Sequence, residues 1–262
     1  MDRPPVGEPD IAAVAALMGE PSRARVLLAL ADGRALPASA LAAEAGVAAS
    51  TASEHLSHLV GAGLLGVEAH GRHRYYRLAG APVGQALEAL ARLAPSRSAI
   101  STRERSRAEG LRRGRLCYDH LAGRLGIAVL QGLLDRGAVV RLDGGRTTAR
   151  RAGDRLAAPV PRSPYTLGPH LGEVAAALGL DLADLGRHRR PLVRCCVDWS
   201  EQAHHLAGAL GAAVTERLLG QGWVRRGAGP RSVVVTGPGA DALLHHLGVR
   251  WDPGPSPGGG PG

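Results

Sequence analysis

Apolar residues near the start of the chain repeat first with the period of a helix and then with that of a strand. Ile11, Val14, Leu17 and Met18 fall on one helical face. Pro21 can open a second helix, which Gly33 ends. The same spacing predicts three more helices, over about 38–45, 49–61 and 82–93. Between the last two, alternation over 64–67 and 74–78 predicts two strands joined by a turn at His70-Gly71.

Further along, the chain carries one short phrase twice. The sequence CYDHLAGRLG begins at Cys117, and HLAGALG begins at His205. When residues 120–139 are moved by 85 positions onto 205–224, 12 of the 20 positions are identical. Each copy predicts a helix, a glycine, a strand, a turn, a strand and a final helix. The leading helix of the first copy is expected to contain Cys117 and Leu121. We therefore predict an internal duplication.

These patterns predict a mainly α protein with small β-wings. The expected fold is an N-terminal winged helix-turn-helix followed by two winged-helix-like C-terminal units. The expected segments are a disordered lead (1–10), a winged helix-turn-helix domain (11–95), a linker (96–110), a duplicated C-terminal domain (111–251, with copies at about 111–182 and 194–251) and a disordered tail (252–262).

Composition narrows the class of protein. The chain has 262 residues, a formal net charge of +9 and a pI near 10.7, and all its cationic side chains except histidine are arginine. A basic chain favours a polyanionic partner such as nucleic acid. No run of 18 apolar residues occurs, so no membrane span is expected. The polar start is unlike a signal peptide, and three cysteines suit a reducing cytoplasm.

Three stretches carry a resemblance to a known family. They are PSRARVLLAL from Pro21, LAAEAGVAASTASEHLSHLVGAGLL from Leu41 and GRHRYYRL from Gly71. The sequences of these stretches resemble those of the ArsR-type winged helix-turn-helix repressors. The resemblance covers about 80 residues, and it implies a homodimer that binds an inverted repeat in double-stranded DNA. The dimer would form through the first and last helices, here about 11–19 and 82–93.

A helix in the major groove needs short polar side chains that reach bases and phosphates. The candidates on the predicted recognition helix are Ser50, Thr51, Ser53, Glu54, His55 and His58. The candidates on the cationic wing are Arg72, His73 and Arg74. Plainer interpretations exist. Ser50 or Thr51 could cap the helix, Thr51-x-x-Glu54 has capping-box spacing, and His55 could pack at the helix-turn-helix junction.

The family resemblance also implies places where an effector metal would bind. The resemblance implies either cysteine ligands in the helix before the recognition helix or carboxylate and histidine ligands on the final helix. Here the helix over 38–45 has no cysteine, and the helix over 82–93 has neither aspartate nor histidine, so neither of these metal sites is present. The remaining candidate ligands for a metal ion or another effector are Cys117, Asp119, His120, Cys196, Asp198, His204 and His205. If the two copies pack pseudo-symmetrically, Cys, Asp and His from each would converge.

These residues also have other interpretations. His120 and His205 could bond backbone at helix starts, and Asp198 could be a helix N-cap. A thiol redox switch and a small organic ligand beside Trp199 and Trp223 stay open as well.

The sequence therefore predicts a transcriptional regulator, a dimeric repressor with an unidentified effector. One alternative is a sequence-tolerant architectural DNA-binding protein. A Cys/His-dependent enzyme is disfavoured, because residues i, i+2 and i+3 of one helix do not align as nucleophile, base and orienting group.

Overall fold

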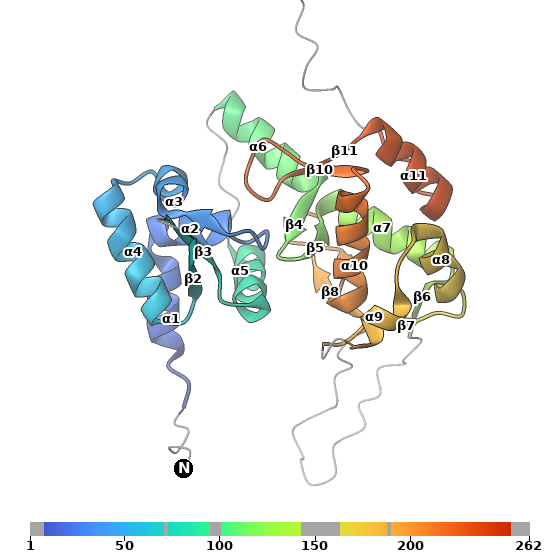
Figure 1. Cartoon of the computed structure of the whole chain (residues 1–262), viewed down its shortest axis with the longest axis horizontal. Helices are drawn as coiled ribbons and strands as arrows, with labels where there is room; N and C mark the ends of the chain where they lie inside the picture. The colour runs from blue at the N-terminus through green and yellow to red at the C-terminus, as the bar shows by residue number, and fades with distance from the viewer. Residues whose placement is uncertain (1–7, 71–72, 95–100, 143–162, 188–189, 253–262) are drawn as a thin grey trace, which may run out of the picture. The chain divides into compact units, whose positions relative to one another are not determined.

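The structure is a computed structural model, and it describes residues 8–70, 73–94, 101–142, 163–187 and 190–252. The chain divides into two compact units, Met1–Leu90 and Ala91–Gly262, here called the N-terminal and C-terminal units (Figure 1). Among the described residues, no helix is long and apolar enough to cross a membrane.

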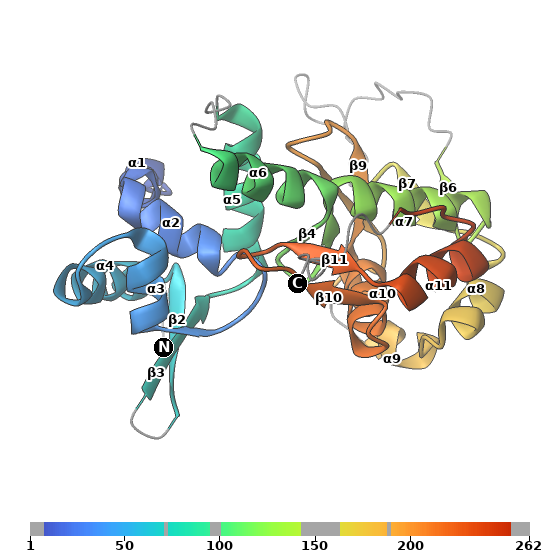
Figure 2. The same cartoon turned by 90° about the horizontal axis from the view of Figure 1, so that it is seen from above.

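The N-terminal unit is a winged helix-turn-helix. Its helices are α1 (Ile11–Gly19), α2 (Pro21–Ala29), α3 (Ala38–Ala45), α4 (Ala49–Gly61) and α5 (Ala81–Leu93), of which α5 extends past the unit boundary. Strands β1 (Leu36–Pro37), β2 (Leu65–His70) and β3 (His73–Leu78) pair antiparallel in the order β1-β3-β2. The β2–β3 ribbon projects as the wing in Figure 2. The pattern of apolar residues predicted every element except β1, whose two residues are too few to show a period.

Leucines from three of these helices fill the core of the N-terminal unit. Leu27 of α2, Leu41 of α3 and Leu56 of α4 are all fully buried. Helix α3 ends at Gly46, whose φ of 70° is a left-handed conformation that glycine adopts without strain. The core and this turn fix α4 as the second helix of the helix-turn-helix.

The C-terminal unit begins with α6 (Thr102–Arg113), which is followed by two halves with the same element order. The first half contains β4 (Arg115–Cys117), β5 (His120–Ala122), α7 (Gly123–Asp135), β6 (Val139–Arg141), β7 (Tyr165–Leu167), α8 (Leu171–Leu178) and α9 (Leu182–Arg187). The second half contains β8 (Arg194–Val197), β9 (His204–Ala207), α10 (Gly208–Gly220), β10 (Val224–Arg226), β11 (Val233–Val235) and α11 (Gly237–Leu247). Among the described elements of the two halves, α9 alone lacks a counterpart.

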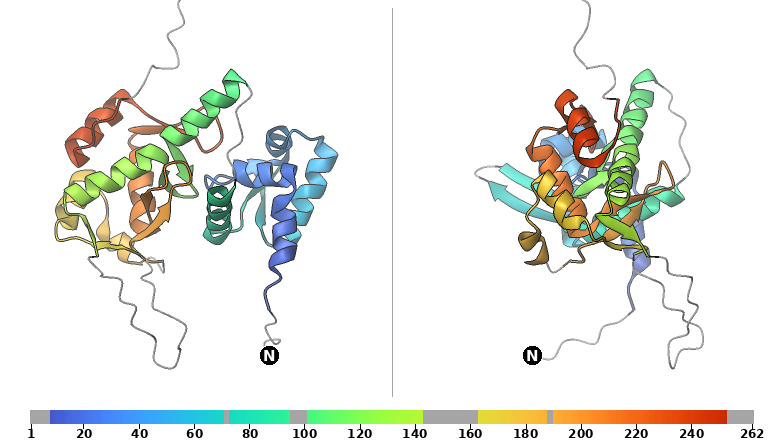
Figure 3. Two further views of the ribbon diagram at one scale, coloured as in Figure 1. Left: turned by 180° about the vertical axis from the view of Figure 1, so that it is seen from behind. Right: turned by 90° about the vertical axis from the view of Figure 1, so that its right-hand side faces the viewer.

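The two halves pack crosswise on one another. Helix α7 of the first half lies against β9 of the second, and α10 of the second half lies against β5 of the first (Figure 3). Thr215 of α10 accepts a hydrogen bond from the Leu121 backbone at 2.9 Å and donates one to the Gly211 carbonyl. Leucines and valines from both halves form one continuous core. Neither half buries its apolar surface alone.

Two predictions about this unit were wrong. Residues 96–110 were expected to be a linker, but 102–113 form a helix. Ser101 and Glu104 form a capping box at the start of this helix. The leading helix was expected to contain Cys117 and Leu121, but both lie in a hairpin with a two-residue turn. The residues of β4 and β5 are all buried, so they lack the alternation that identifies a strand.

The repeated phrase has a steric basis at its glycines. Gly123 and Gly208 open α7 and α10 with φ values of 70° and 82°. A Cβ on Gly126 would lie 2.4 Å from the Leu121 carbonyl oxygen. A Cβ on Gly211 would likewise lie 2.7 Å from the carbonyl oxygen of Leu206. Each phrase is thus a strand followed at once by a helix that returns onto the backbone of that strand.

We predict that Gly126→Ala destabilises the C-terminal unit by roughly 1–3 kcal/mol, because a backbone oxygen cannot move away from the new methyl group. Gly172→Ala in α8 is the control, since its Cβ would meet nothing within 4 Å. The control should be neutral or stabilising by about 0.5–1 kcal/mol. Urea unfolding measures both variants, and equal stabilities would disprove the close packing of α7.

Candidate functional site

The outer face of α4 presents most of the side chains expected to read DNA. Ser50, Ser53, Glu54 and His58 are exposed, and Thr51 is half-buried. The Ser53 hydroxyl donates to the Ala49 carbonyl at 2.9 Å. This exposed polar strip has the side-chain sizes that fit a major groove.

The structure differs from the capping interpretation of this helix. The N-cap of α4 is Ala48, and no side chain caps it. Thr51 lies inside the helix, so Thr51-x-x-Glu54 is not a capping box. Neither Ser50 nor Thr51 therefore caps this helix.

His55 faces inward, toward the start of α2. Its Nε2 atom lies 3.6 Å from Oε2 of Glu20, and the side chain is only 14% exposed. Glu20 caps α2 through the backbone amides of Ser22 and Arg23, which lowers the pKa of its carboxyl group below the usual value. This geometry favours the packing interpretation of His55 over contact with a base.

The wing ends in a cationic tip that the structure describes in part. Arg74 is exposed and opposes Ala69 across the ribbon. Arg72 and the side chain of His73 lie outside the described residues. Arg77 nearer the base of the wing is paired with Glu68 at 2.7 Å. Arg74 is therefore the described wing arginine best placed for a phosphate.

In the C-terminal unit, four of the predicted ligand residues converge. The possible ligand atoms of Cys117, His120, Cys196 and His205 all lie within 4.8 Å of one another, and we call this group the Cys/His cluster. Cys117 is the cross-strand partner of His120 in the β4–β5 hairpin, and Cys196 that of His205 in β8–β9. The two imidazole rings stack with centroids 5.2 Å apart.

The groups of the Cys/His cluster perturb one another. Hydrogen bonding by the Cys117 thiol and attraction to His120 hold the pKa of the Cys196 thiol well below its usual range, although burial opposes this. Burial lowers the pKa of His120, but Asp119 and Cys196 outweigh burial and raise it overall. Burial dominates at His205 and lowers its pKa. The arrangement favours a thiolate among nitrogen donors, the form in which cysteine binds a metal.

Comparison with known proteins assigns the chain to a family. Residues 18–68 match the model of a helix-turn-helix domain. An uncharacterized HTH-type transcriptional regulator of Bacillus subtilis (strain 168), YdfF, is 37% identical over 242 residues, which are 92% of this chain and 99% of the relative. The chain belongs to the helix-turn-helix transcriptional regulators. The relative matches the C-terminal unit as well as the DNA-binding one.

Solved structures resemble the N-terminal unit. The cadmium sensor CMTR of Mycobacterium tuberculosis is 32% identical over 35% of this chain and 99% of its own, with a TM-score of 0.28. The homodimeric winged helix-turn-helix domain of Mb0332 from Mycobacterium bovis, described as a possible ArsR-family regulator, is 29% identical over 34% and 87%, with a TM-score of 0.29. The helix-turn-helix regulator expected from the sequence is confirmed by the family model and by the Bacillus subtilis relative.

The other predicted ligand residues of this regulator lie around the Cys/His cluster. The Asp119 carboxylate accepts from Nδ1 of His120 at 3.0 Å and pairs with Arg190. His204 turns away from the cluster and contacts the Tyr165 hydroxyl at 3.1 Å. His120 and His205 lie in strands, so they do not bond backbone at helix starts.

Asp198 is a buried anchor between the two halves. Burial alone would raise the pKa of its carboxyl group, but Arg115 and several hydrogen bonds hold it below the usual value. The fully buried guanidinium of Arg115 lies 3.0 Å from Oδ2, and the Gly123 amide donates to the same oxygen at 2.6 Å. The amides of Ser200 and Glu201 donate to Oδ1. Asp198 was predicted as a metal or effector ligand, with a helix N-cap as the other interpretation. The N-cap interpretation is wrong, because Asp198 closes a turn that leads into β9 at His204.

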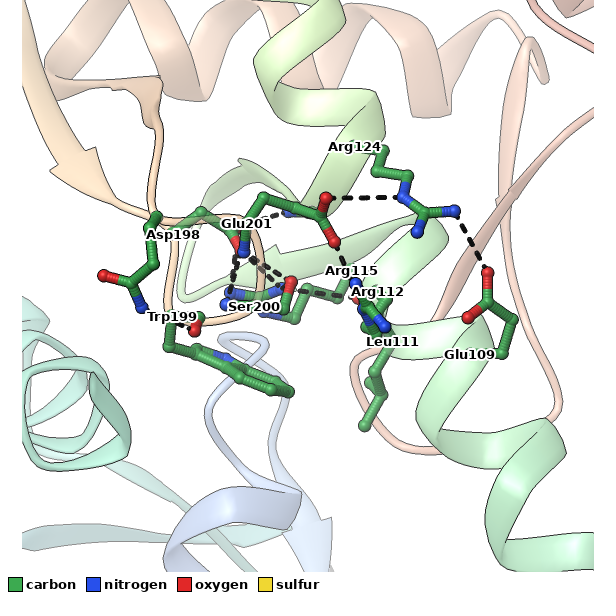
Figure 4. A network of polar contacts seen from close by, with 11 residues as sticks. Glu109, Leu111, Arg112, Arg115, Arg124, Asp198, Trp199, Ser200 and Glu201 are labelled. Carbon is green, nitrogen blue, oxygen red and sulfur yellow. Dashed lines mark hydrogen bonds and ion pairs between the residues drawn. The ribbon is translucent and has the colours of Figure 1, made fainter. Parts of the chain in front are cut away.

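Around Asp198 the contacts extend to the surface (Figure 4). Arg112 of α6 lies 3.2 Å from Glu201, and Arg124 of α7 bridges Glu201 and Glu109 of α6. Arg115 was not identified from the sequence, because its carboxylate partner Asp198 lies 83 residues away.

Replacing Asp198 with asparagine removes the carboxylate charge that lies 3.0 Å from the buried guanidinium of Arg115. We expect Asp198→Asn to lower the free energy of unfolding of the C-terminal unit by about 3–5 kcal/mol. The control is Asp184→Asn, which breaks an exposed pair with Arg187 and should cost less than about 1 kcal/mol. Equal losses in denaturant unfolding would contradict the role of Asp198.

Proposed function

We propose that this regulator is a dimeric repressor that binds an inverted-repeat operator and responds to an effector held by its C-terminal unit. The observation that carries the proposal is the exposed polar face of α4 beside a cationic wing. The chain also matches a named regulator over 92% of its length. Such a protein works in the cytoplasm, where its DNA is. We propose no enzymatic activity.

Exposed apolar side chains on two helices support the dimer. Ile11 and Val14 of α1 are 76% and 40% exposed, and Leu90 and Leu93 of α5 are 48% and 83% exposed. These are the two helices to which the ArsR-type resemblance assigns the dimer contact. Water contact at four large apolar side chains is unfavourable, and a partner subunit would remove it.

A symmetric dimer would place two α4 helices in successive major grooves. Half-site centres would then lie roughly 34–36 Å apart, which is one turn of the DNA helix. An effector that changes the distance between these helices changes operator affinity by linkage. The C-terminal unit supplies the effector site in this proposal, because it holds a buried cluster of ligand-type side chains.

The dimer contact can be tested with a double variant, Leu90→Glu with Leu93→Glu. We expect sedimentation to show a monomer, because paired burial of these positions would place carboxylates in an apolar contact. Leu244→Glu in α11 is the control, since Leu244 is as exposed as Leu90, at 48%, and its replacement should leave the dimer intact. A double variant that stays dimeric would place the interface elsewhere.

A second prediction concerns the wing. Arg74→Ala should weaken operator binding at all sequences alike and reduce the slope of log affinity against log salt by about 1, because one phosphate contact is lost. Arg187→Ala on α9 removes an equal charge and should leave the slope unchanged. Titration by fluorescence anisotropy over a salt series separates the two, and an unaltered slope in Arg74→Ala would remove the wing from the DNA contact.

Selection from a random duplex library tests the operator itself. An enriched inverted repeat supports the proposal. Tight binding without enrichment would instead favour the architectural alternative, in which charge alone carries affinity.

A further inference from the structure

We infer that the Cys/His cluster is a closed binding site for one zinc ion, shared between the two halves of the C-terminal unit. The site does not depend on the proposed function. The claim that the bound zinc is the effector of the regulator rests on the proposed function.

The four ligand residues come in two matched pairs. Each hairpin brings one cysteine and one histidine together as cross-strand partners, Cys117 with His120 and Cys196 with His205. Partners in antiparallel strands have Cβ atoms about 4.5–5.5 Å apart, so both side chains of a pair reach the same point. Contact between β5 and β9 then brings the two pairs face to face. The result is two sulfur and two nitrogen donors around one centre.

Unpartnered nitrogen atoms point to a missing ligand. Nε2 of His120 and both ring nitrogens of His205 are buried without a hydrogen bond among the described residues. A buried ring nitrogen without a hydrogen bond has lost its bonds to water, which is unfavourable. A metal ion would satisfy one nitrogen on each ring.

Carboxylates select which nitrogen is left for the metal. Asp119 accepts from Nδ1 of His120 at 3.0 Å, and Oδ2 of Asp198 lies 3.7 Å from Nδ1 of His205. Histidines that bind metals commonly donate their other ring nitrogen to a carboxylate, which fixes the tautomer and the ring orientation. His120 therefore has this outer hydrogen bond, and at His205 the Asp198 carboxylate lies beside the equivalent nitrogen, which leaves Nε2 of each ring for the metal.

The spacing suits a small tetrahedral ion. Zinc bonds of about 2.0–2.1 Å to nitrogen and about 2.3 Å to sulfur give a tetrahedron with edges of roughly 3.3–3.8 Å. All four ligand atoms lie within 4.8 Å of one another, so modest side-chain rotations close the shell. Two thiolates with two imidazoles are the donors of zinc, and they do not suit magnesium or calcium, which prefer oxygen.

Burial argues against a larger occupant. Cys117 and His120 are 2% and 5% exposed, His205 is fully buried, and Cys196 is half-buried. Cys196, His120 and Asp119 do bring a thiol, an imidazole and a carboxylate together, as a cysteine enzyme does. A substrate could not reach them through this packing, whereas a bare ion can. Four protein ligands also leave no open position for catalysis.

Metal content of the purified full-length protein tests the site. We expect one zinc ion per chain by elemental analysis after purification in reductant. Cadmium exchanged into the protein should show a sulfur-to-metal absorption band with the intensity of two thiolates. Absence of stoichiometric metal from folded wild-type protein, even after dialysis against zinc, would overturn the inference.

Neighbouring residues offer matched control variants. Cys117→Ser and Cys196→Ser should each reduce zinc affinity by at least 100-fold in chelator competition. Cys195→Ser and His204→Gln change the residues next to Cys196 in β8 and next to His205 in β9. Both control variants should bind zinc as the wild type does. An equal loss of zinc affinity in Cys195→Ser and Cys196→Ser would contradict the assignment. Metal retained in the Cys117/Cys196 double variant would contradict it as well. Circular dichroism checks folding, and for an unfolded variant the wild-type stoichiometry decides.

Two outcomes separate the metal site from the proposed function. Zinc that binds stoichiometrically but leaves operator affinity unchanged would keep the site and remove the metal as effector. A disulfide between Cys117 and Cys196 in protein purified without reductant, with no metal uptake after reduction, would replace the zinc site with a thiol pair.

Discussion

The buried carboxylate of Asp198 joins the two halves of the C-terminal unit. It comes from the loop of the second hairpin, and it binds Arg115 and the Gly123 amide of the first half. An isolated charge of either sign would be too costly to bury, so each group requires the other. The pair fixes the start of α7 against the second hairpin. The same carboxylate lies beside the Cys/His cluster, with Oδ2 3.7 Å from Nδ1 of His205.

Much of the N-terminal unit was predictable from the sequence, because its helices and wing are amphipathic. Leu27, Leu41 and Leu56 lie on the apolar faces of three predicted helices, and each is fully buried. The β4–β5 hairpin was mistaken for a helix because all of its residues are buried, and such a strand shows no alternation. The alternative interpretation of Asp198 as a helix N-cap was wrong because the sequence did not reveal the β8–β9 hairpin, whose loop contains Asp198.

The residue types in the sequence indicated the candidate ligands, but the sequence did not show which of these side chains face one another. Cysteine, aspartate and histidine in a repeated phrase indicated the ligands, and Cys117, His120, Cys196 and His205 do converge. The sequence could not separate them from His204, because only strand register decides which of two adjacent histidines faces inward. Arg115 was missed because nothing local to it shows that its charge is buried. Its partner lies 83 residues away.

The two units suit different tasks in one regulator. The N-terminal unit exposes polar side chains on α4 and a cationic wing, while the C-terminal unit encloses its ligand-type side chains. A closed site with one Cys and one His from each half can respond only to something small enough to enter it. Filling it would tie β5 to β9 and stabilise the crossed packing of α7 and α10.

X-ray absorption at the zinc edge of the full-length protein measures the shared site most directly. We expect a first shell of two sulfur atoms near 2.3 Å and two nitrogen atoms near 2.0 Å, about the distances of a Cys₂His₂ zinc site. Multiple scattering from imidazole should accompany it. A shell of oxygen and nitrogen without sulfur would show that any bound zinc lies outside the Cys/His cluster, which would contradict the site.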